Sequence, residues 1–241
     1  MKGQAARHQG AAMIEWLAPW PVDFPPLENA LETPNGLLAA GGDLTPEWLL
    51  SAYQHGIFPW FNEDDPILWW SPDPRMVLFP ESLRVRRSLA KRLRNSGMTA
   101  TFDQAFEAVI TQCAAQRQAQ EGTWISSDII NAYVTMHQLG HGHSVEVWEG
   151  DMLVGGLYGI MLGRVFFGES MFSIRPDSSK IALVRLVEWL SRHHDLALVD
   201  CQMHTSHLAS MGACDISRDQ FNALLKRYIP ADFQETVIPR R

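Results

Sequence analysis

The chain has no long hydrophobic run and few cysteines. It contains no stretch of about 18 consecutive apolar residues, which excludes a membrane-spanning helix of ordinary length. The first 16 residues lack the unbroken apolar core of a secretory signal, so we expect no export. The three cysteines, Cys113, Cys201 and Cys214, are odd in number and indicate no disulfide framework. A reducing, cytoplasmic location fits this composition best.

Motifs for common cofactors are also missing. No GxxxxGK[ST] or GxGxxG segment opens a predicted helix, which argues against a nucleotide-binding loop. The pairs His141/His143 and His204/His207 lack the spacing of a zinc finger or ribbon, and no CxxC pair accompanies them. We therefore interpret these histidines as structural and expect no metal site.

Charge is distributed unevenly along this acidic chain. The formal net charge of −7 argues against a general nucleic-acid coat protein. Six cations nevertheless fall within eleven residues that contain no acid, and we name them the basic segment: Arg84, Arg86, Arg87, Lys91, Arg92 and Arg94. This segment indicates either a docking surface for a polyanion or a solvated helix face. Lys180 lies beside the start of a later predicted helix, where it either strengthens an anion site or is an ordinary surface lysine.

The spacing of apolar residues predicts an α+β protein. Residues 24–73 are rich in Pro, Gly and Trp and contain one short helix, which Thr45 caps and Gly56 ends. After His143, short alternating strands joined by tight turns predict an antiparallel meander. A last strand follows a helix, so the sheet should be mixed but mostly antiparallel. The other predicted elements are helices near 82–95, 103–117, 128–139, 179–193 and 217–228 and strands near 144–148, 153–160, 164–168 and 196–202.

Two of the predicted strands end in acidic and amide groups. Glu169 follows one apolar run, and Asp200 and Gln202 end the strand at 196–202. A carboxylate at the end of a half-buried strand is costly unless a cation or a hydrogen-bond donor meets it. The two strand ends therefore predict a cleft for a positively charged or amine-bearing ligand. Strict alternation turns Cys201 away from its neighbours, so we interpret it as a small buried residue rather than a nucleophile.

Aromatic residues gather in two runs of the N-terminal region. Residues 56–61 and 68–72 contain several rigid rings close to Gly and Pro. These rings are either the core of a small module or the wall of a pocket, and one ring can serve both purposes.

Many of these motifs, taken in order, resemble the leucyl/phenylalanyl-tRNA–protein transferase family. The resemblance runs from about Phe24 to about Pro230, and residues 203–206 depart from the family pattern. The matching segments are Pro34–Leu44 (PNGLLAAGGDL), Gly56–Phe61 (GIFPWF), Trp69–Arg75 (WWSPDPR), Gly122–Ile125 (GTWI), Gly140–Trp148 (GHGHSVEVW), Phe167–Ser173 (FGESMFS) and Asp200–Gln202 (DCQ).

The resemblance implies both an architecture and an activity. A small N-terminal domain with a loosely ordered leader (1–73) would precede a larger acetyltransferase-like, GNAT-like domain (74–241). The enzyme would transfer Leu or Phe, and Met less well, from aminoacyl-tRNA to the N-terminal Arg or Lys of acceptor proteins. The new peptide bond would mark them for N-degron proteolysis. No cofactor is implied, and we expect a cytoplasmic monomer.

The same resemblance assigns catalytic roles to Asp200, Gln202 and Glu169. Gln202 would position the attacking amine or, polarised by Asp200, act as a base. Asp200 would hold the amine, the basic side chain of the acceptor, or Gln202 itself. Glu169 would meet the cationic group of the acceptor through a charge-assisted hydrogen bond.

Substrate contacts follow from the chemistry of the donor. Met171, Phe172 and Ser173 would line an apolar slot for the Leu or Phe side chain. Trp60 and Trp124 would stack on the terminal adenine. The basic segment, together with Lys180, would hold phosphates of the tRNA acceptor stem.

Two other readings of the sequence compete with this one. An acetyl-CoA-dependent N-acetyltransferase would need a glycine-containing pyrophosphate loop, and residues 174–179 contain no glycine. A non-catalytic RNA-binding module would explain the basic segment and the aromatic rings. It would leave Glu169, Asp200 and Gln202 without a role.

Overall fold

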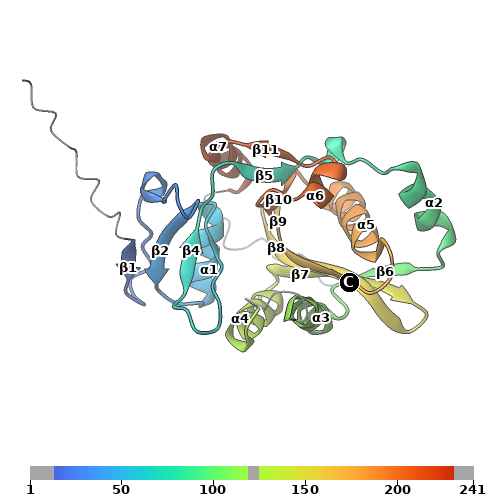
Figure 1. Ribbon diagram of the computed structural model, residues 1–241, viewed down its shortest axis with the longest axis horizontal. Coiled ribbons are helices and arrows are strands. Elements are labelled where there is room, and N and C mark those ends of the chain that lie inside the picture. The colour runs from blue at the N-terminus through green and yellow to red at the C-terminus, as the bar shows by residue number, and fades with distance from the viewer. Residues whose placement is uncertain (1–13, 119–124, 231–241) are drawn as a thin grey trace, which may run out of the picture.

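The computed structural model describes residues 14–118 and 125–230, which form a small sheet and a larger sheet (Figure 1). The small sheet has the strand order β1-β2-β4-β3, in which β1 and β2 run parallel and the other pairs antiparallel. Its strands are β1 (Glu15–Leu17), β2 (Leu37–Gly41), β3 (Phe58–Pro59) and β4 (Leu68–Trp70).

Helix α1 (Pro46–Gln54) belongs to the small domain and confirms the helix predicted after Thr45. Proline suits the first turn because that turn needs no amide donor. The chain leaves the helix through Gly56, whose φ of 73° favours glycine. Trp48 of this helix is buried and stacks on Trp69 of β4, with 5.7 Å between the ring centroids. These two rings therefore belong to the hydrophobic core.

The larger sheet has the strand order β11-β5-β10-β9-β8-β7-β6. β9 and β10 pair in parallel, and the other neighbouring strands pair antiparallel. These two sheets confirm the predicted α+β class, with a small N-terminal part and a mixed, mostly antiparallel main sheet. The strands are β5 (Arg75–Leu78), β6 (Thr99–Phe102), β7 (Gly142–Glu149), β8 (Met152–Leu162), β9 (Val165–Ser173), β10 (Leu198–Gln202) and β11 (Cys214–Ile216).

Helices cover both faces of the larger sheet (Figure 1). α3 and α4 lie on one face and share a core with the small domain, whereas α5 lies on the other face above a second core. None of the helices within the described ranges is long and apolar enough to cross a membrane. The remaining helical elements are α2 (Arg87–Asn95), α3 (Phe106–Gln118), α4 (Ser127–Gln138), α5 (Ser178–His193), α6 (Ser206–Ser210), α7 (Arg218–Tyr228) and the 3₁₀ turns η1 (Leu27–Asn29) and η2 (Pro80–Ser82).

The small sheet passes into the larger one between β4 and β5. β4 ends at Trp70 and β5 begins at Arg75, close to the predicted domain limit after Asp73. The limits 1–73 and 74–241 remain a prediction, because one core cluster contains residues of both parts, including Trp69 and Phe167.

Candidate active site

The two strands singled out in the sequence lie side by side and then separate. β9 and β10 are paired only from Val165 and Leu198 to Phe167 and Asp200. Beyond that point a cavity of about 320 Å³ opens between them, bordered by α5 and α6. Most of its wall is apolar and is formed by Leu157, Phe166, Met171, Leu183, Leu186, Val199 and Leu208.

Each of these strands carries a β-bulge at the point of separation. In β9, Glu169 is the extra residue between the pairs Tyr158–Ser170 and Gly159–Gly168. In β10, the register shifts between Asp200 and Gln202 in the pairing with β5. A bulge adds one residue to a strand and re-aims the side chains beside it. The bulges therefore turn Glu169 and Gln202 toward each other across the opening.

Glu169 is buried and accepts three hydrogen bonds. Its Oε1 accepts from the Tyr53 hydroxyl at 2.7 Å and from Gln202 Nε2 at 3.1 Å, and its Oε2 accepts from the Tyr133 hydroxyl at 3.0 Å. The two tyrosine hydroxyls also contact each other. Burial raises the pKa of the Glu169 carboxyl to about 7, because the loss of hydration outweighs the stabilisation from the hydroxyl donors.

Asp200 is fully buried in an ion pair with Arg75. Arg75 Nε and Nη2 donate to its two carboxylate oxygens at 2.8 and 2.7 Å, and the Gln202 backbone N–H donates to Oδ1 at 2.9 Å. The guanidinium also lies over the rings of Phe58 and Phe221. Of the three roles left open by the sequence, this geometry favours Asp200 as the residue that holds Gln202.

Gln202 is fixed at both its backbone and its side chain. Its φ of 61° is left-handed, which is uncommon outside glycine, and its backbone N–H is held by Asp200. Its side-chain nitrogen donates to Glu169. Since an ionised carboxylate only accepts hydrogen bonds, this contact leaves the Gln202 carbonyl oxygen on the far side of the amide. That oxygen is available to a donor such as an amine.

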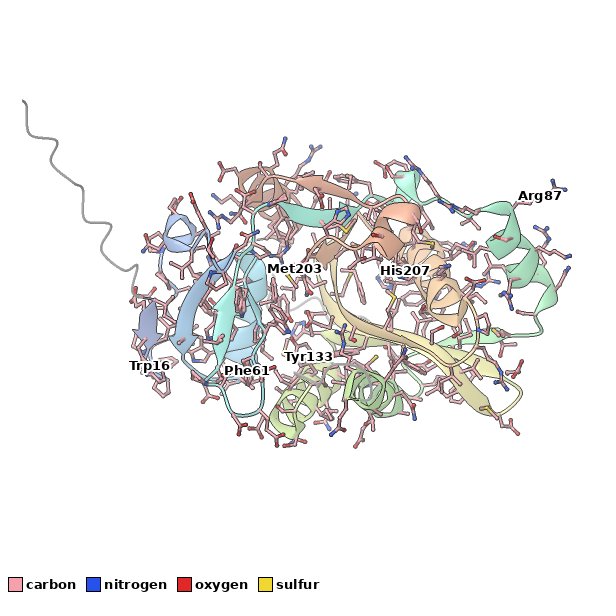
Figure 2. All side chains as sticks on the ribbon, viewed as in Figure 1. Trp16, Phe61, Arg87, Tyr133, Met203 and His207 are labelled. Atoms are coloured by element: carbon pink, nitrogen blue, oxygen red, sulfur yellow. The ribbon has the colours of Figure 1, made fainter. Side chains whose placement is uncertain are left out.

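A second cavity, of about 90 Å³, lies on the small-domain side of the same residues. Its wall includes Trp60, Phe58 and Pro59. The contact of Trp60 with the terminal adenine remains a prediction. Both cavities are bordered by Arg117, Glu169, Gln202 and Met203. Figure 2 shows Met203 and Tyr133 near the junction of the small sheet with the larger one. Glu169 and Gln202 therefore stand where the two spaces meet.

The predicted slot residues do not all reach the cavity. Met171 lines it, whereas Phe172 and Ser173 do not. Phe172 is buried in the core on the α3 side, because successive side chains of a strand point to opposite faces. The Ser173 hydroxyl instead forms hydrogen bonds with the Ser178 hydroxyl and the Arg175 carbonyl, each 2.9 Å long. Trp124 lies outside the described residues, so its contact with adenine remains a prediction.

Cys201 occupies the β10 bulge and lies on the cavity wall. Strict alternation, which the bulge interrupts, does not describe its position. Burial raises the pKa of its thiol well above the ordinary range, with the Asp200 carboxylate adding to the effect. A protonated thiol is a poor nucleophile, so the geometry gives Cys201 a packing role.

The basic segment lies at the opposite end of the molecule from the small sheet, as Arg87 and Trp16 show in Figure 2. Arg87, Lys91, Arg92 and Arg94 lie on α2, and Arg84 and Arg86 precede it. Asp177 joins this segment to Lys180, accepting from Arg92 at 3.1 Å and from Lys180 at 2.8 Å. The structure thus brings Lys180 beside the basic segment, at the start of α5.

Two of the four histidines considered as metal ligands have carboxylate partners. His143 contacts the Asp103 carboxylate through Nδ1 at 2.8 Å and the Gly140 carbonyl through Nε2 at 3.1 Å. His204 contacts Asp215 at 2.9 Å. His207 lines the larger cavity and interacts electrostatically with Lys180 and Asp177.

Several residues of the site gave little signal in the sequence. Tyr53 and Tyr133 read only as members of the buried faces of two helices. Arg75 stands immediately before an apolar run. Of these residues it alone gave a signal, because a cation at the edge of a buried strand indicates a buried, oppositely charged partner. Arg117 lies at the C-terminal end of α3, where basic residues are ordinary.

Comparison with known proteins finds one family along most of the chain. Residues 77–226 match the family model described as leucyl/phenylalanyl-tRNA protein transferase, and residues 42–73 match the model of its N-terminal domain. A protein of that name from Chromohalobacter salexigens is 60% identical over 227 residues, which are 94% of this chain and 88% of the relative. Its namesake from Hydrogenovibrio crunogenus is 58% identical over 219 residues, 90% of this chain and 85% of the relative.

Among solved structures, a GCN5-related N-acetyltransferase from Kribbella flavida covers 71% of this chain and 61% of its own, with 11% identity and a TM-score of 0.36. The two family models together extend from the small sheet to α7. With this coverage and this identity to its relatives, the chain belongs to the leucyl/phenylalanyl-tRNA–protein transferase family.

Proposed function

We propose that this chain transfers leucine or phenylalanine, and methionine less well, from aminoacyl-tRNA to proteins that begin with arginine or lysine. The product would be marked for N-degron proteolysis, and the enzyme would act as a cytoplasmic monomer. The observation that carries the proposal is the apolar cavity that opens directly beside the Glu169–Gln202 contact. This arrangement can bind an apolar side chain in the cavity and place the reacting groups beside Glu169 and Gln202 at the same time.

The size of the larger cavity suits the proposed donors. An apolar cavity of about 150 Å³ is enough to bind benzene. The cavity between β9 and β10 is about 320 Å³ and has room for a leucine or phenylalanine side chain. Met171 on its wall is unbranched and adapts to either shape.

The proposed chemistry needs little besides positioning. The donor ester is already activated, and the acceptor amine has a pKa of about 7.7–8, so roughly a tenth to a fifth is free base at pH 7. Holding amine and ester in register supplies about 7–11 kcal/mol of the barrier. The Gln202 carbonyl would accept a hydrogen bond from the amine and direct it to the ester. Glu169 would attract the positively charged N-terminal residue of the acceptor protein.

The tRNA would contact two separate regions. Trp60 offers a ring to the terminal adenine at the smaller cavity, a contact worth about 1–3 kcal/mol. The basic segment and Lys180 would bind backbone phosphates, which carry no sequence information. The enzyme would thus select the amino acid while tolerating most of the tRNA sequence.

Incubation with labelled Phe-tRNA and an Arg-starting peptide, without coenzyme A, tests the proposal. We expect the label to appear on the N-terminus of that peptide and to be absent from a matched peptide that starts with Asp. An RNA-binding module would bind the tRNA and transfer nothing. A coenzyme A-dependent enzyme would also leave both peptides unlabelled, and either result would contradict the proposal.

A further inference from the structure

Tyr53, Tyr133 and Glu169 form a closed triangle of hydrogen-bonded oxygens. The Tyr53 hydroxyl contacts Glu169 Oε1, the Tyr133 hydroxyl contacts Glu169 Oε2, and the two hydroxyls contact each other. All three side chains are buried, and they come from α1, α4 and β9. The triangle therefore ties the small domain to both the helical layer and the sheet of the larger domain.

A count of hydrogens shows which protonation state completes this triangle. Each hydroxyl contributes one hydrogen, so an ionised Glu169 leaves two hydrogens for three contacts. A protonated Glu169 supplies the third. Its Oε2 then donates to Tyr133, Tyr133 donates to Tyr53, and Tyr53 donates to Oε1. The hydrogen bond from Gln202 to Oε1 is kept in both states.

We propose that Glu169 takes the proton from the attacking amine, and that Tyr53 and Tyr133 are positioning residues that hold its carboxyl group in place in both protonation states. This inference rests on the proposed function, because it concerns the proton released when an amine becomes an amide. Glu169 borders both cavities and touches Gln202, so it stands beside the place assigned to the amine.

The other candidate bases at the site are less suited. The Gln202 carbonyl is a very weak proton acceptor. Both oxygens of Asp200 are held by the Arg75 guanidinium. His207 borders only the larger of the two cavities. Cys201 is partly buried, and its raised pKa keeps the thiol protonated.

The proposed step balances in atoms and charge. The amine nitrogen forms a bond to the ester carbonyl carbon, and its proton passes to the Glu169 carboxylate. The bond between that carbon and the ribose oxygen then breaks. The ribose oxygen leaves with the proton that Glu169 returns, so Glu169 ends the cycle ionised and the products are an amide and a free ribose hydroxyl.

The surroundings of Glu169 tune it for this exchange. Burial holds the pKa of its carboxyl at about 7, near the pH at which a general base works best. The Asp200 carboxylate raises that pKa further, and the Arg75 guanidinium lowers it. The titratable and charged groups that face Glu169 are Tyr53 of α1, Tyr133 of α4, Tyr158 of β8, Arg75 of β5, Asp200 of β10 and Arg117 of α3.

The test is the pH profile of single-turnover transfer from Phe-tRNA to an Arg-starting peptide, from about pH 5.5 to about pH 9, which brackets both the carboxyl and the amine. Wild type should show two titrations, one from the acceptor amine and one from Glu169. Glu169→Gln should lower the rate by roughly 100-fold or more and keep only the amine titration. Glu146→Gln, which removes another buried carboxyl of the same sheet, should retain the wild-type rate and profile.

Two further readouts keep the inference open to refutation if a variant is unstable. The infrared band of a protonated carboxyl should titrate in wild type and in Glu146→Gln and be absent in Glu169→Gln. Tyr53→Phe and Tyr133→Phe should each slow transfer about tenfold, and the double variant should be little slower than either, because the triangle acts as a unit.

The possible failures of this test are distinguishable. A wild-type enzyme that transfers nothing to the Arg-starting peptide would overturn the proposed function. A wild-type enzyme that transfers normally, with a Glu169→Gln variant that keeps its rate or both titrations, would overturn only the inference about Glu169.

Discussion

Glu146 and Glu169 are both buried in the larger sheet, and each accepts three hydrogen bonds. Glu146, on β7, accepts from the hydroxyls of Thr101 and Ser144 at 2.5 Å each and from the Ala105 backbone N–H at 3.3 Å. Glu169, on β9, accepts from two tyrosine hydroxyls and a glutamine amide. Burial and the number of donors therefore do not distinguish the two glutamates.

The two glutamates differ in where their donors come from and in what space they border. The donors of Glu146 belong to its own strand, to the neighbouring β6 and to the turn after β6, and Glu146 lines neither of the two cavities. The donors of Glu169 come from α1, α4 and β10, and Glu169 borders both cavities. A buried carboxylate therefore indicates a functional site when its hydrogen-bond donors come from several separate helices and strands and when it borders a cavity.

A third buried carboxylate, Asp200, extends the comparison and should give the largest effect. Asp200→Ala leaves the Arg75 charge buried without its partner, which should cost about 3–5 kcal/mol of unfolding free energy. The folded fraction should lose transfer to an Arg-starting peptide while still binding aminoacyl-tRNA. Urea denaturation and filter binding measure the two quantities, and equal losses of transfer and binding would contradict the positioning role.

Stability should depend on pH through Glu169. The folded pKa of Glu169 is raised from 4.5 to about 7, so its contribution to stability is present below pH 4.5 and is lost as the pH rises through 7. The loss should be at most about 3 kcal/mol. Glu169→Gln should remove it. Denaturation midpoints at several pH values check this, and a parallel curve for the variant would rule it out.

Glu146→Gln should show the opposite pattern to Glu169→Gln at neutral pH. The amide that replaces the carboxylate weakens two charge-assisted bonds and presents donors to donors, which should cost about 1–3 kcal/mol. Transfer by the folded enzyme should be unchanged. Thermal unfolding and single-turnover assays measure both, and a Glu146→Gln variant that is fully folded but inactive would break the comparison.

Substitutions at Met171, which lines the larger cavity, and at its neighbour Phe172, which does not, should differ in their effect on amino-acid selectivity. Met171→Trp should reject Phe before Leu, changing the ratio of their transfer rates by about tenfold, since small volume differences in apolar pockets are worth about 1–3 kcal/mol. Phe172→Leu, on the opposite sheet face, is the matched control. An unaltered Phe/Leu ratio in Met171→Trp would remove Met171 from the slot.

The basic segment should give the smallest effect on transfer at low salt. Replacing Arg84, Arg86 and Arg87 by Ala should weaken tRNA binding and reduce its salt slope by at most about 2–3, the value for three lost phosphate contacts. Replacing Lys226 and Arg227 of α7 serves as the control. Binding isotherms at several salt concentrations measure the slope, and no change would place the tRNA elsewhere.

The sequence predicted the elements whose pattern is local. Alternation and short turns indicated β7, β8 and β9, and the periodic apolar faces indicated α3, α4, α5 and α7. β5 gave no such signal because all four of its residues are buried, which removes alternation. β6 and β11, with four and three residues, are too short to show a period.

The composition of the site was predictable, whereas its geometry was not. Asp200 and Gln202 stand at the end of β10, as the sequence indicates, whereas the expectation that a strand ends before Glu169 was wrong, because β9 continues through the bulge to Ser173. The β10 bulge has no glycine or proline of its own, so strict alternation misplaced Cys201. The partner of Asp200 is Arg75, 125 residues away in the sequence, and only the folded sheet brings them together.

A structure of the enzyme with an amide-linked phenylalanyl-adenosine tests the central claim most directly. We expect the phenyl ring in the cavity between β9 and β10, against Met171 and Leu186, with its carbonyl carbon beside Gln202 and Glu169. A phenyl ring bound anywhere outside that cavity, or a carbonyl remote from both side chains, would contradict the account.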